Sequence, residues 1–260
     1  MRDTFTAQGW LHLPQHTPPA LLERLTAGAE RMMGSILEHA HHSEATPNVW
    51  QVPGARFREP AFADPALDQL AAALGRALLG CERVQLLQDV LLLKPPRCTG
   101  QIAWHRDYTY LGFLDPSIVT LRVALTDSSE QMGCMEVIDT SHTWRPRGDD
   151  QRIFASELGA DALQALTPEQ RAQVERLRRP LPMQAGDVTA HHCLTIHGSF
   201  ENPTDTPRMS LLLRLFDARC RLRADQLPPH AAAHFQTTPD GHLDPNAFPL
   251  LDAGAPEGLT

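Results

Sequence analysis

The sequence predicts a mainly β protein with flanking helices, and three features of the chain support this prediction. After residue 82 the chain consists of short apolar runs separated by Pro, Gly and Asp, which is typical of a β-sandwich or barrel. Before residue 82, two longer stretches carry apolar residues at helical spacing. The length of 260 residues and the hydrophobic content of 42% suit one domain with its own buried core. We therefore expect a single domain over residues 1–260.

Two amphipathic helices are expected in residues 1–82, where they would support the β-rich core. The first runs from Pro18 to about Leu37, and the second runs from Asp64 to Leu79. Residues 40–60 lie between the two helices and are rich in His, Pro and polar groups. This composition favours a loop.

Six segments are expected to form strands of a core that covers residues 83–222. They are residues 84–94, 101–105, 117–126, 134–138, 187–193 and 208–217. An insert of roughly residues 143–180 interrupts the core and could overhang a site. Within it we expect a helix near Thr167, because Thr-Pro-Glu-Gln supplies an N-cap, a proline at the first helical position and a capping-box Gln. Residues 223–260 carry many prolines without a period and are expected to form an irregular tail.

Two of the expected strands alternate between apolar and polar side chains. In segment 117–126, Thr120 and Arg122 alternate with Val and Leu. In segment 208–217, Arg208, Ser210 and Arg214 alternate with Met and Leu. Two interpretations remain open. The polar faces could point to solvent, as is common in antiparallel sheets. Alternatively, the apolar faces could pack under the N-terminal helices while the polar faces line a wet cavity inside a jelly roll.

Composition and charge exclude several classes of partner. The net charge is −8 and the arginines are scattered, so no basic stripe is available for nucleic acid. The N-terminus lacks the pattern of a signal peptide, and no stretch approaches the roughly 20 apolar residues needed to span a bilayer. The five cysteines form no C-x-x-C motif and are expected to be reduced thiols. We expect a cytoplasmic protein without membrane or nucleic-acid partners, and its oligomeric state is not predicted.

His105 and Asp107 are the first candidate metal ligands. They lie two residues apart at the end of an expected strand, so both side chains can leave the same face. A second histidine would complete a 2-His-1-carboxylate face, which leaves open positions on an iron ion. The H-x-D spacing alone is weak evidence for a metal site, because it recurs at His242 and Asp244 in the tail, where no strand or arginine follows.

His197 is the leading candidate for the third ligand. It follows the Gly186-Asp187 turn and a strand, and Arg208 opens another strand eleven residues later. An arginine that faces into a barrel suits bidentate capture of a carboxylate. Taken singly, His197 could instead be a buried histidine bonded to the backbone, and Arg208 could form a surface ion pair. Three further histidines are rivals for the third ligand position: His142, His191 and His192.

The order and spacing of these motifs resemble the phytanoyl-CoA dioxygenase family of Fe(II)/2-oxoglutarate-dependent oxygenases. The resemblance spans roughly residues 5–220. It rests on these segments: Trp104-His105-Arg106-Asp107 with Tyr108-Thr109-Tyr110, residues 133–142, Gly186-Asp187, and the group His197, Ser199, Asn202 and Arg208. Thr140 stands where the family usually has glycine, which leaves the ligand set untouched but puts the geometry of that turn in question.

The resemblance implies a double-stranded β-helix (jelly roll) core and two cofactors. Fe(II) would be held by His105, Asp107 and His197, and 2-oxoglutarate would be held by Arg208 and Ser199. Three more residues are expected to contact the cofactors: Lys94, Gln88 and Trp104. The family often has a lysine six residues after a glutamine, as here, and Lys94 is the single lysine among 23 basic residues. A compact ammonium would fit where the broad guanidinium fork does not.

The resemblance further implies hydroxylation of a small organic metabolite with O2 and release of succinate and CO2. Desaturation, epoxidation and ring formation remain open. Asp107 argues against halogenation, because related halogenases replace this carboxylate with a small residue. Two alternatives are a cupin-type enzyme without 2-oxoglutarate and a non-catalytic binding or sensor protein, and succinate release would discriminate among them. No feature of the sequence names the substrate.

Arg122, Arg214 and Tyr108 are candidate substrate contacts. Strand alternation places both arginines on the face of Arg208. Because an unpaired buried charge is costly, each arginine needs an anion. Internal carboxylates such as Glu136 or Asp127 could serve, and so could a carboxylate or phosphate of the substrate.

Overall fold

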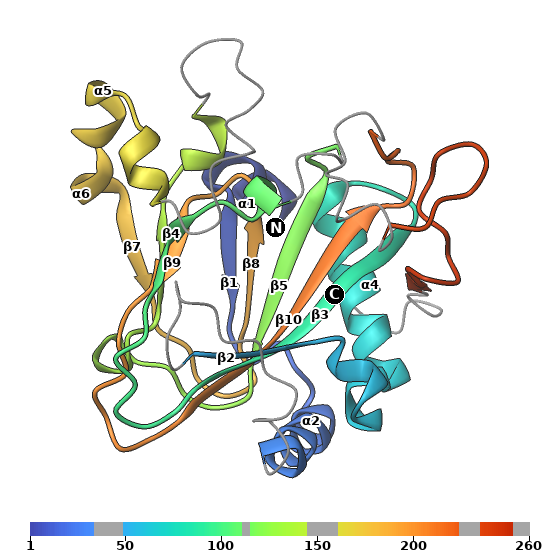
Figure 1. Ribbon diagram of the computed structural model, residues 1–260, viewed down its shortest axis with the longest axis horizontal. Coiled ribbons are helices and arrows are strands. Elements are labelled where there is room, and N and C mark those ends of the chain that lie inside the picture. Colours follow the sequence, from blue (N-terminus) through green and yellow to red (C-terminus); the bar gives the residue numbers. More distant parts are fainter. Residues whose placement is uncertain (34–48, 111–114, 145–160, 224–234, 252–260) are drawn as a thin grey trace.

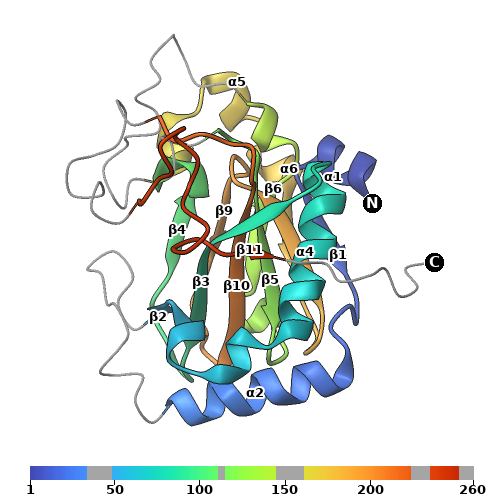
Figure 2. The same ribbon diagram turned by 90° about the vertical axis from the view of Figure 1, so that its right-hand side faces the viewer.

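Two antiparallel β-sheets form a jelly roll, and helices cover the outer side of the larger sheet (Figures 1 and 2). The computed structural model describes residues 1–33, 49–110, 115–144, 161–223 and 235–251. The expected mainly β architecture with a jelly-roll core is confirmed. No helix within these ranges is long and apolar enough to cross a membrane.

The larger sheet has seven strands and the smaller sheet has four. In spatial order the larger sheet contains β1 (Trp10–Leu13), β8 (Val188–His192), β5 (Ile118–Ala124), β10 (Arg208–Asp217), β3 (Val84–Lys94) and β11 (Leu250–Leu251), with β2 (Trp50–Pro53) also paired to β3. The smaller sheet contains β4 (Ile102–His105), β9 (His197–Ser199), β6 (Met135–Ile138) and β7 (Arg178–Leu181). All six expected strands are present, most with bounds one or two residues shorter than predicted.

The two N-terminal helices form where apolar spacing and capping residues predict them. Helix α4 (Pro65–Leu79) begins after Asp64, whose carboxylate accepts a hydrogen bond from the Ala66 backbone N–H at 2.8 Å, and it ends at Gly80 in the left-handed region. Helix α2 is described over Pro19–Met33, and the expected continuation to Leu37 lies outside the described residues. The other α-helices are α1 (Arg2–Gln8), α5 (Pro168–Arg171) and α6 (Val174–Leu177).

Short 3-10 helices connect the main elements. They are η1 (Ala55–Phe57), η2 (Pro60–Ala63), η3 (Asp107–Tyr110), η4 (Glu130–Met132), η5 (Ser141–Thr143) and η7 (Ala162–Ala165). The expected capping box of the insert is confirmed at the start of α5, where the Thr167 and Gln170 side chains each accept a hydrogen bond from the other's backbone N–H.

The apolar faces of β5 and β10 pack against the helices. Val119, Leu121 and Val123 share one buried cluster with Leu21 and Leu25 of α2 and with alanines and leucines of α4. The polar side chains on the opposite face are buried as well: Thr120, Arg122, Arg208 and Ser210. The polar faces therefore point into the jelly roll and not to solvent, which excludes the first interpretation of the alternating pattern.

Several segments differ from the expectations. Residues 1–82 are not helical support alone, because β1 and β2 join the larger sheet, and β2 replaces part of the loop expected at 40–60. The expected insert ends earlier than residue 180, since β7 pairs with β6. The tail is not wholly irregular, because β11 pairs with β3 and Phe248 is buried. These strands are two to four residues long, too short to show a period. Parts of the loop, insert and tail lie outside the described residues.

The turn at Thr140 has the geometry that glycine favours. Thr140 has φ 61° and ψ 0°, in the left-handed region, and it precedes η5. The next residue, Ser141, donates its hydroxyl to the Ile138 carbonyl at 2.7 Å and accepts the Ile196 backbone N–H at 2.9 Å. The turn therefore ties the end of β6 to the residue that precedes His197.

Candidate metal centre and anion pocket

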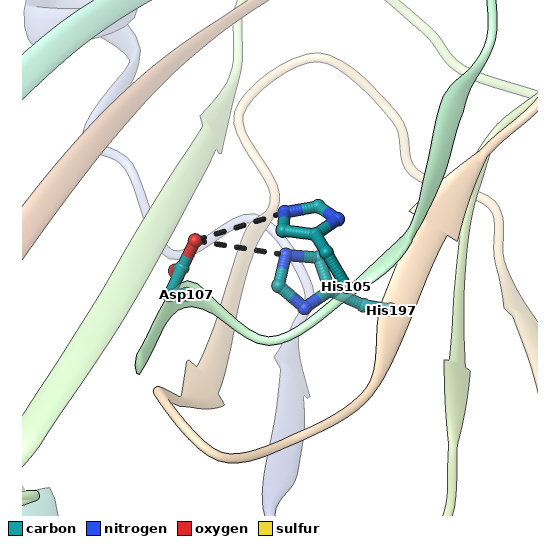
Figure 3. Close-up of side chains that lie close together, drawn as sticks. All are labelled: His105, Asp107 and His197. Carbon is teal, nitrogen blue, oxygen red and sulfur yellow. Dashed lines mark ion pairs between the residues drawn. The ribbon is translucent and has the colours of Figure 1, made fainter. Parts of the chain in front are cut away.

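His105, Asp107 and His197 come together from two strands and the 3-10 helix that follows one of them. His105 ends β4, His197 begins β9, and these residues are paired across the smaller sheet. Their Nε2 atoms lie 3.8 and 4.0 Å from the Oδ1 atom of Asp107 (Figure 3). One ligand atom from each residue lies within 4.8 Å of the others, so a single ion could contact all three. Among the described residues, this is the one such group of three or more ligands.

Backbone carbonyls orient both imidazole rings. The Nδ1 atom of His105 lies 2.8 Å from the Ala103 carbonyl oxygen, and that of His197 lies 3.0 Å from the Thr195 carbonyl oxygen. A carbonyl oxygen can only accept, so each ring carries its proton on Nδ1 and presents a lone pair on Nε2. Burial lowers the pKa of both histidines below the ordinary value. A metal ion requires neutral imidazole rings that present a lone pair on Nε2.

Three side chains that lie side by side on neighbouring strands of the larger sheet contact the Asp107 carboxylate. His191 of β8, Thr120 of β5 and Arg214 of β10 are direct cross-strand neighbours. Thr120 donates its hydroxyl to Oδ2 at 2.6 Å, and His191 Nε2 lies 3.3 Å from the same oxygen. Arg214 donates to Oδ1 at 3.0 Å. The carboxylate is thus fixed with Oδ1 turned toward the two histidines.

The surroundings of Asp107 keep its carboxylate ionised. Burial alone would raise the pKa of this group, which is 1% exposed. Arg214, the hydrogen bond from His191, and His197 outweigh burial and hold the pKa well below its usual value. The group can therefore act as an anionic ligand.

The three rival histidines contact other groups. His191 contacts the second oxygen of Asp107 and does not complete the triad. His142 directs Nε2 to the Thr6 carbonyl oxygen at 2.9 Å, and the Nδ1 atom of His192 accepts the Leu194 backbone N–H at 3.1 Å. Asp187 has the turn role expected of it, because it accepts hydrogen bonds from the backbone N–H groups of Gln15 and Gln184.

A second cluster, the anion pocket, is formed by Lys94, Arg122, Ser199 and Arg208. Lys94 ends β3, Arg208 begins β10, and the two are direct cross-strand neighbours. Arg208 is 1% exposed and donates to the Gly133 carbonyl oxygen. Lys94 is fully buried and donates to the Ser199 and Phe200 carbonyl oxygens.

Three polar atoms of the anion pocket lack a protein partner. Arg208 Nε, Arg122 Nη2 and Ser199 Oγ are buried and have no hydrogen-bond partner within the described residues. Unsatisfied buried donors are rare because they cost about 1–3 kcal/mol each, and more for charged groups. A bound anion would satisfy all three.

The electrostatics of the anion pocket support this conclusion. Burial, together with the neighbouring Arg122, lowers the pKa of Arg208 to about 9. Burial also lowers the pKa of Arg122 to about 10. The pKa of Lys94 falls to about 7 through burial and the charge of Arg208. A negatively charged ligand would offset the mutual repulsion of these three buried basic side chains.

Gln88 and Arg214 lie at the metal end of the sheet. They are cross-strand neighbours, and Arg214 donates to the Gln88 side-chain oxygen as well as to Asp107. The structure therefore separates Gln88 from Lys94, although both were expected to contact the cofactors. It likewise separates Arg214, beside the candidate metal ligands, from Arg122, beside Arg208.

Trp104 and Tyr108 lie outside both clusters. The Trp104 ring packs in a separate apolar cluster with Ile138 and Leu166, because neighbouring residues of a strand point to opposite faces and His105 faces the metal centre. Tyr108 is 2% exposed in another cluster, and its hydroxyl accepts a hydrogen bond from Arg223 at 2.5 Å. The expectations that Trp104 contacts a cofactor and that Tyr108 contacts the substrate stay predictions, and neither residue belongs to the metal centre or the anion pocket.

Two residues that shape the site were not singled out for it in the sequence. Thr120 was expected on the polar face, but its bond to Asp107 depends on how β5 lies against η3. Gly133 supplies the carbonyl bonded by Arg208 and has φ 61°, and a Cβ atom there would lie 2.1 Å from the Glu201 carbonyl oxygen. The left-handed region and the close approach both require glycine.

Comparisons with known proteins find relatives of this chain. A family model described as phytanoyl-CoA dioxygenase (PhyH) matches residues 5–210. The chain is 26% identical over 162 residues to phytanoyl-CoA dioxygenase domain-containing protein 1 of Mus musculus, covering 62% of this chain and 54% of that protein. The chain thus spans about half the length of this curated relative.

Two solved structures share the fold over nearly the whole chain. The carbocyclase SnoK from nogalamycin biosynthesis, described as non-heme and alpha ketoglutarate dependent, has a TM-score of 0.76 and 24% identity, covering 96% of this chain and 94% of that one. The epimerase SnoN, in complex with Fe3+, alpha ketoglutarate and nogalamycin RO, has a TM-score of 0.72 and 25% identity, covering 96% of this chain and 97% of that one.

Proposed function

We propose that this chain, which belongs to the phytanoyl-CoA dioxygenase family, is an Fe(II)- and 2-oxoglutarate-dependent dioxygenase that acts on a small organic metabolite. The observation that carries the proposal is the triad of His105, Asp107 and His197. Both Nε2 atoms face one carboxylate oxygen, and both rings are fixed by backbone carbonyls. Two imidazoles and one carboxylate on one side of an ion are the donor set of non-haem iron oxygenases.

The anion pocket supports 2-oxoglutarate as the second component. Arg208 would bind the distal carboxylate with its free Nε, and Ser199 would donate its hydroxyl. Both residues lie in strands that also carry groups of the metal centre, since Ser199 is two residues after His197 and Arg208 shares β10 with Arg214. A ligand anchored there can reach the ion with its other end. SnoN holds iron together with alpha ketoglutarate.

The chain's own residues would bind the cofactors, orient the metal ligands and keep each ligand in the charge state that it needs. When bound, iron would activate O2, the oxidant, which would take two electrons from 2-oxoglutarate as it becomes succinate and CO2 and two electrons from the substrate. The protein keeps His105 and His197 neutral, keeps Asp107 anionic, and fixes all three donors before the ion binds. Fixed donors lose little freedom on binding, which favours a single coordination geometry.

The substrate would lie on the side of the metal centre where Arg214 and Gln88 are found. Arg214 is 19% exposed at its side chain, so it can meet a ligand as well as Asp107. We propose hydroxylation as the reaction, while the similar folds of a carbocyclase and an epimerase leave other oxidative outcomes open. A cytoplasmic location stays a prediction.

The test is a screen for succinate. The protein is loaded with Fe(II) and incubated with 2-oxoglutarate, O2 and a library of small metabolites, and succinate is measured. Wild type should release succinate in a substrate-dependent way, and His197→Ala should release none. His142→Ala is the control, because His142 contacts a backbone carbonyl away from the triad. Loss of iron in His142→Ala with retention in His197→Ala would overturn the ligand assignment.

A further inference from the structure

We infer that Arg122 is a second arginine of the co-substrate site, which binds the distal carboxylate of 2-oxoglutarate together with Arg208. The inference rests on the proposed function and adds a residue that sets the charge and selectivity of the pocket. The sequence left Arg122 as a substrate contact or as the partner of an internal carboxylate. The structure favours neither alternative.

The register of the larger sheet places Arg122 between the metal centre and Arg208. Arg122 is two residues from Thr120 on β5, a spacing of ~7 Å that keeps both side chains on one face. Its cross-strand neighbour on β10 is Leu212, which lies in sequence between Arg208 and the metal-facing Arg214. Arg122 is also close enough to Arg208 to lower its pKa.

Hydrogen bonds inside the pocket hold the Arg122 side chain but leave one donor free. Its Nε donates to the Ser210 hydroxyl at 3.0 Å, and Nη1 lies 3.1 Å from the sulfur of Met183. Its Nη2 is buried without a partner in the described parts of the chain. The guanidinium is therefore oriented by neutral groups, while the end that could bind an anion remains unpaired.

Internal carboxylates do not neutralise Arg122. Glu136, one expected partner, is paired with Arg178. Asp127, the other, accepts the Ala185 backbone N–H at 2.8 Å. No hydrogen bond joins Arg122 to any carboxylate within the described residues. By contrast, Arg214 has an internal partner in Asp107.

The free donors match one carboxylate group. An ionised carboxylate has two oxygens with about four lone-pair sites. The pocket offers Nε of Arg208, Nη2 of Arg122 and the hydroxyl of Ser199, all buried and unsatisfied within the described residues. One carboxylate could accept all three bonds. A hydrogen bond from each of two guanidiniums would be charge-assisted and correspondingly strong.

Two consequences follow from a pair of arginines. Affinity should depend steeply on the distal negative charge, because a neutral ligand leaves both guanidiniums buried and unpaired. The ligand-free protein should carry electrostatic strain that neutral substitution of Arg122 relieves. A merely structural arginine would show the opposite behaviour, since its removal lowers stability.

The test is calorimetric binding of 2-oxoglutarate to protein loaded with Mn(II), without any primary substrate. The variants are Arg122→Gln and Arg208→Gln, and each is also titrated with 2-oxopentanoate, which has a methyl group where 2-oxoglutarate has the distal carboxylate. Arg56→Gln is the control, because Arg56 is a largely buried arginine paired with Asp68 outside the pocket. We expect Arg122→Gln to weaken 2-oxoglutarate binding at least tenfold and to leave 2-oxopentanoate binding nearly unchanged. Its thermal midpoint without ligand should be at least that of wild type.

The other possible outcomes distinguish failure of the Arg122 inference from failure of the proposed function. If Arg208→Gln weakens binding and Arg122→Gln does not, the inference is wrong and the proposed function stands. If Arg122→Gln lowers the midpoint of the ligand-free protein or prevents folding, Arg122 is structural and the inference is again wrong. If wild type binds no 2-oxoglutarate at all, the proposed function itself fails.

Discussion

The hydroxyl of Thr120 is predicted to set the metal affinity, although this residue is not a ligand. Thr120→Val keeps the branched shape of a fully buried side chain and removes only the 2.6 Å hydrogen bond to Asp107. A hydrogen bond to a charged group contributes roughly 1.5–3 kcal/mol. At about 1.4 kcal/mol per tenfold change, this corresponds to a loss of about 10- to 100-fold in affinity. The same range is typical for residues that orient metal ligands.

The lower half of this range is the expected result, because His191 and Arg214 continue to hold Asp107. The assay is the dissociation constant of Mn(II) or anaerobic Fe(II), measured by competition with a chelator. Thr189→Val is the matched control, since Thr189 is a fully buried threonine of the same sheet whose hydroxyl contacts the Met183 sulfur. An affinity of Thr120→Val within twofold of wild type would show that the Thr120 hydroxyl does not set the metal affinity.

Four further predictions concern other residues of the fold and site. Lys94→Arg should raise the Michaelis constant for 2-oxoglutarate, because the broad guanidinium cannot replace the buried ammonium; full activity with unchanged constants would contradict this. The pKa of Lys94 is lowered from 10.5 to about 7, so between these pH values the unfolded chain binds one proton more than the folded protein. The free energy of unfolding should therefore rise with pH in this window. Denaturant titrations should show that Lys94→Met removes this pH dependence. Thr140→Gly should stabilise the fold by up to about 1 kcal/mol, since Thr140 occupies the left-handed region without a side-chain capping bond, and an unchanged or lower melting midpoint would argue against strain there. Arg214→Gln should weaken binding of an anionic substrate about tenfold more than binding of its neutral ester; equal losses for both would show that Arg214 does not recognise substrate charge.

The longer helices and strands could be predicted because the sequence patterns that define them involve neighbouring residues. Helix α4 and strands β3 and β10 match their expected bounds within one residue, since capping residues and alternation act over neighbouring positions. Strands β7 and β9 have four and three residues, and they form by pairing with strands that lie far away in the sequence, β7 with β6 and β9 with β4 and β6. No local pattern could indicate them.

The candidate site was predictable in its components and less so in its contacts. The spacing of His105 and Asp107 indicated two ligands, whereas the choice of His197 over His191 required the family resemblance. The direction of the Trp104 side chain could be predicted from the sequence, because Trp104 precedes His105 in a strand and points to the opposite face. The different partners of Arg122 and Arg214 could not be predicted, since they depend on which strands lie beside β5 and β10.

The most direct test of the account is anaerobic titration of the Fe(II)-loaded protein with 2-oxoglutarate. Chelation of Fe(II) by a 2-oxo acid produces a visible charge-transfer absorption, which reports the metal and the co-substrate in one signal. We expect a saturable band in wild type and no band in His197→Ala. In Arg208→Gln the band should need more than about 100-fold more 2-oxoglutarate, because losing one partner of a buried ion pair costs about 3–5 kcal/mol. A wild-type protein without the band, or a His197→Ala variant that keeps it, would contradict the account.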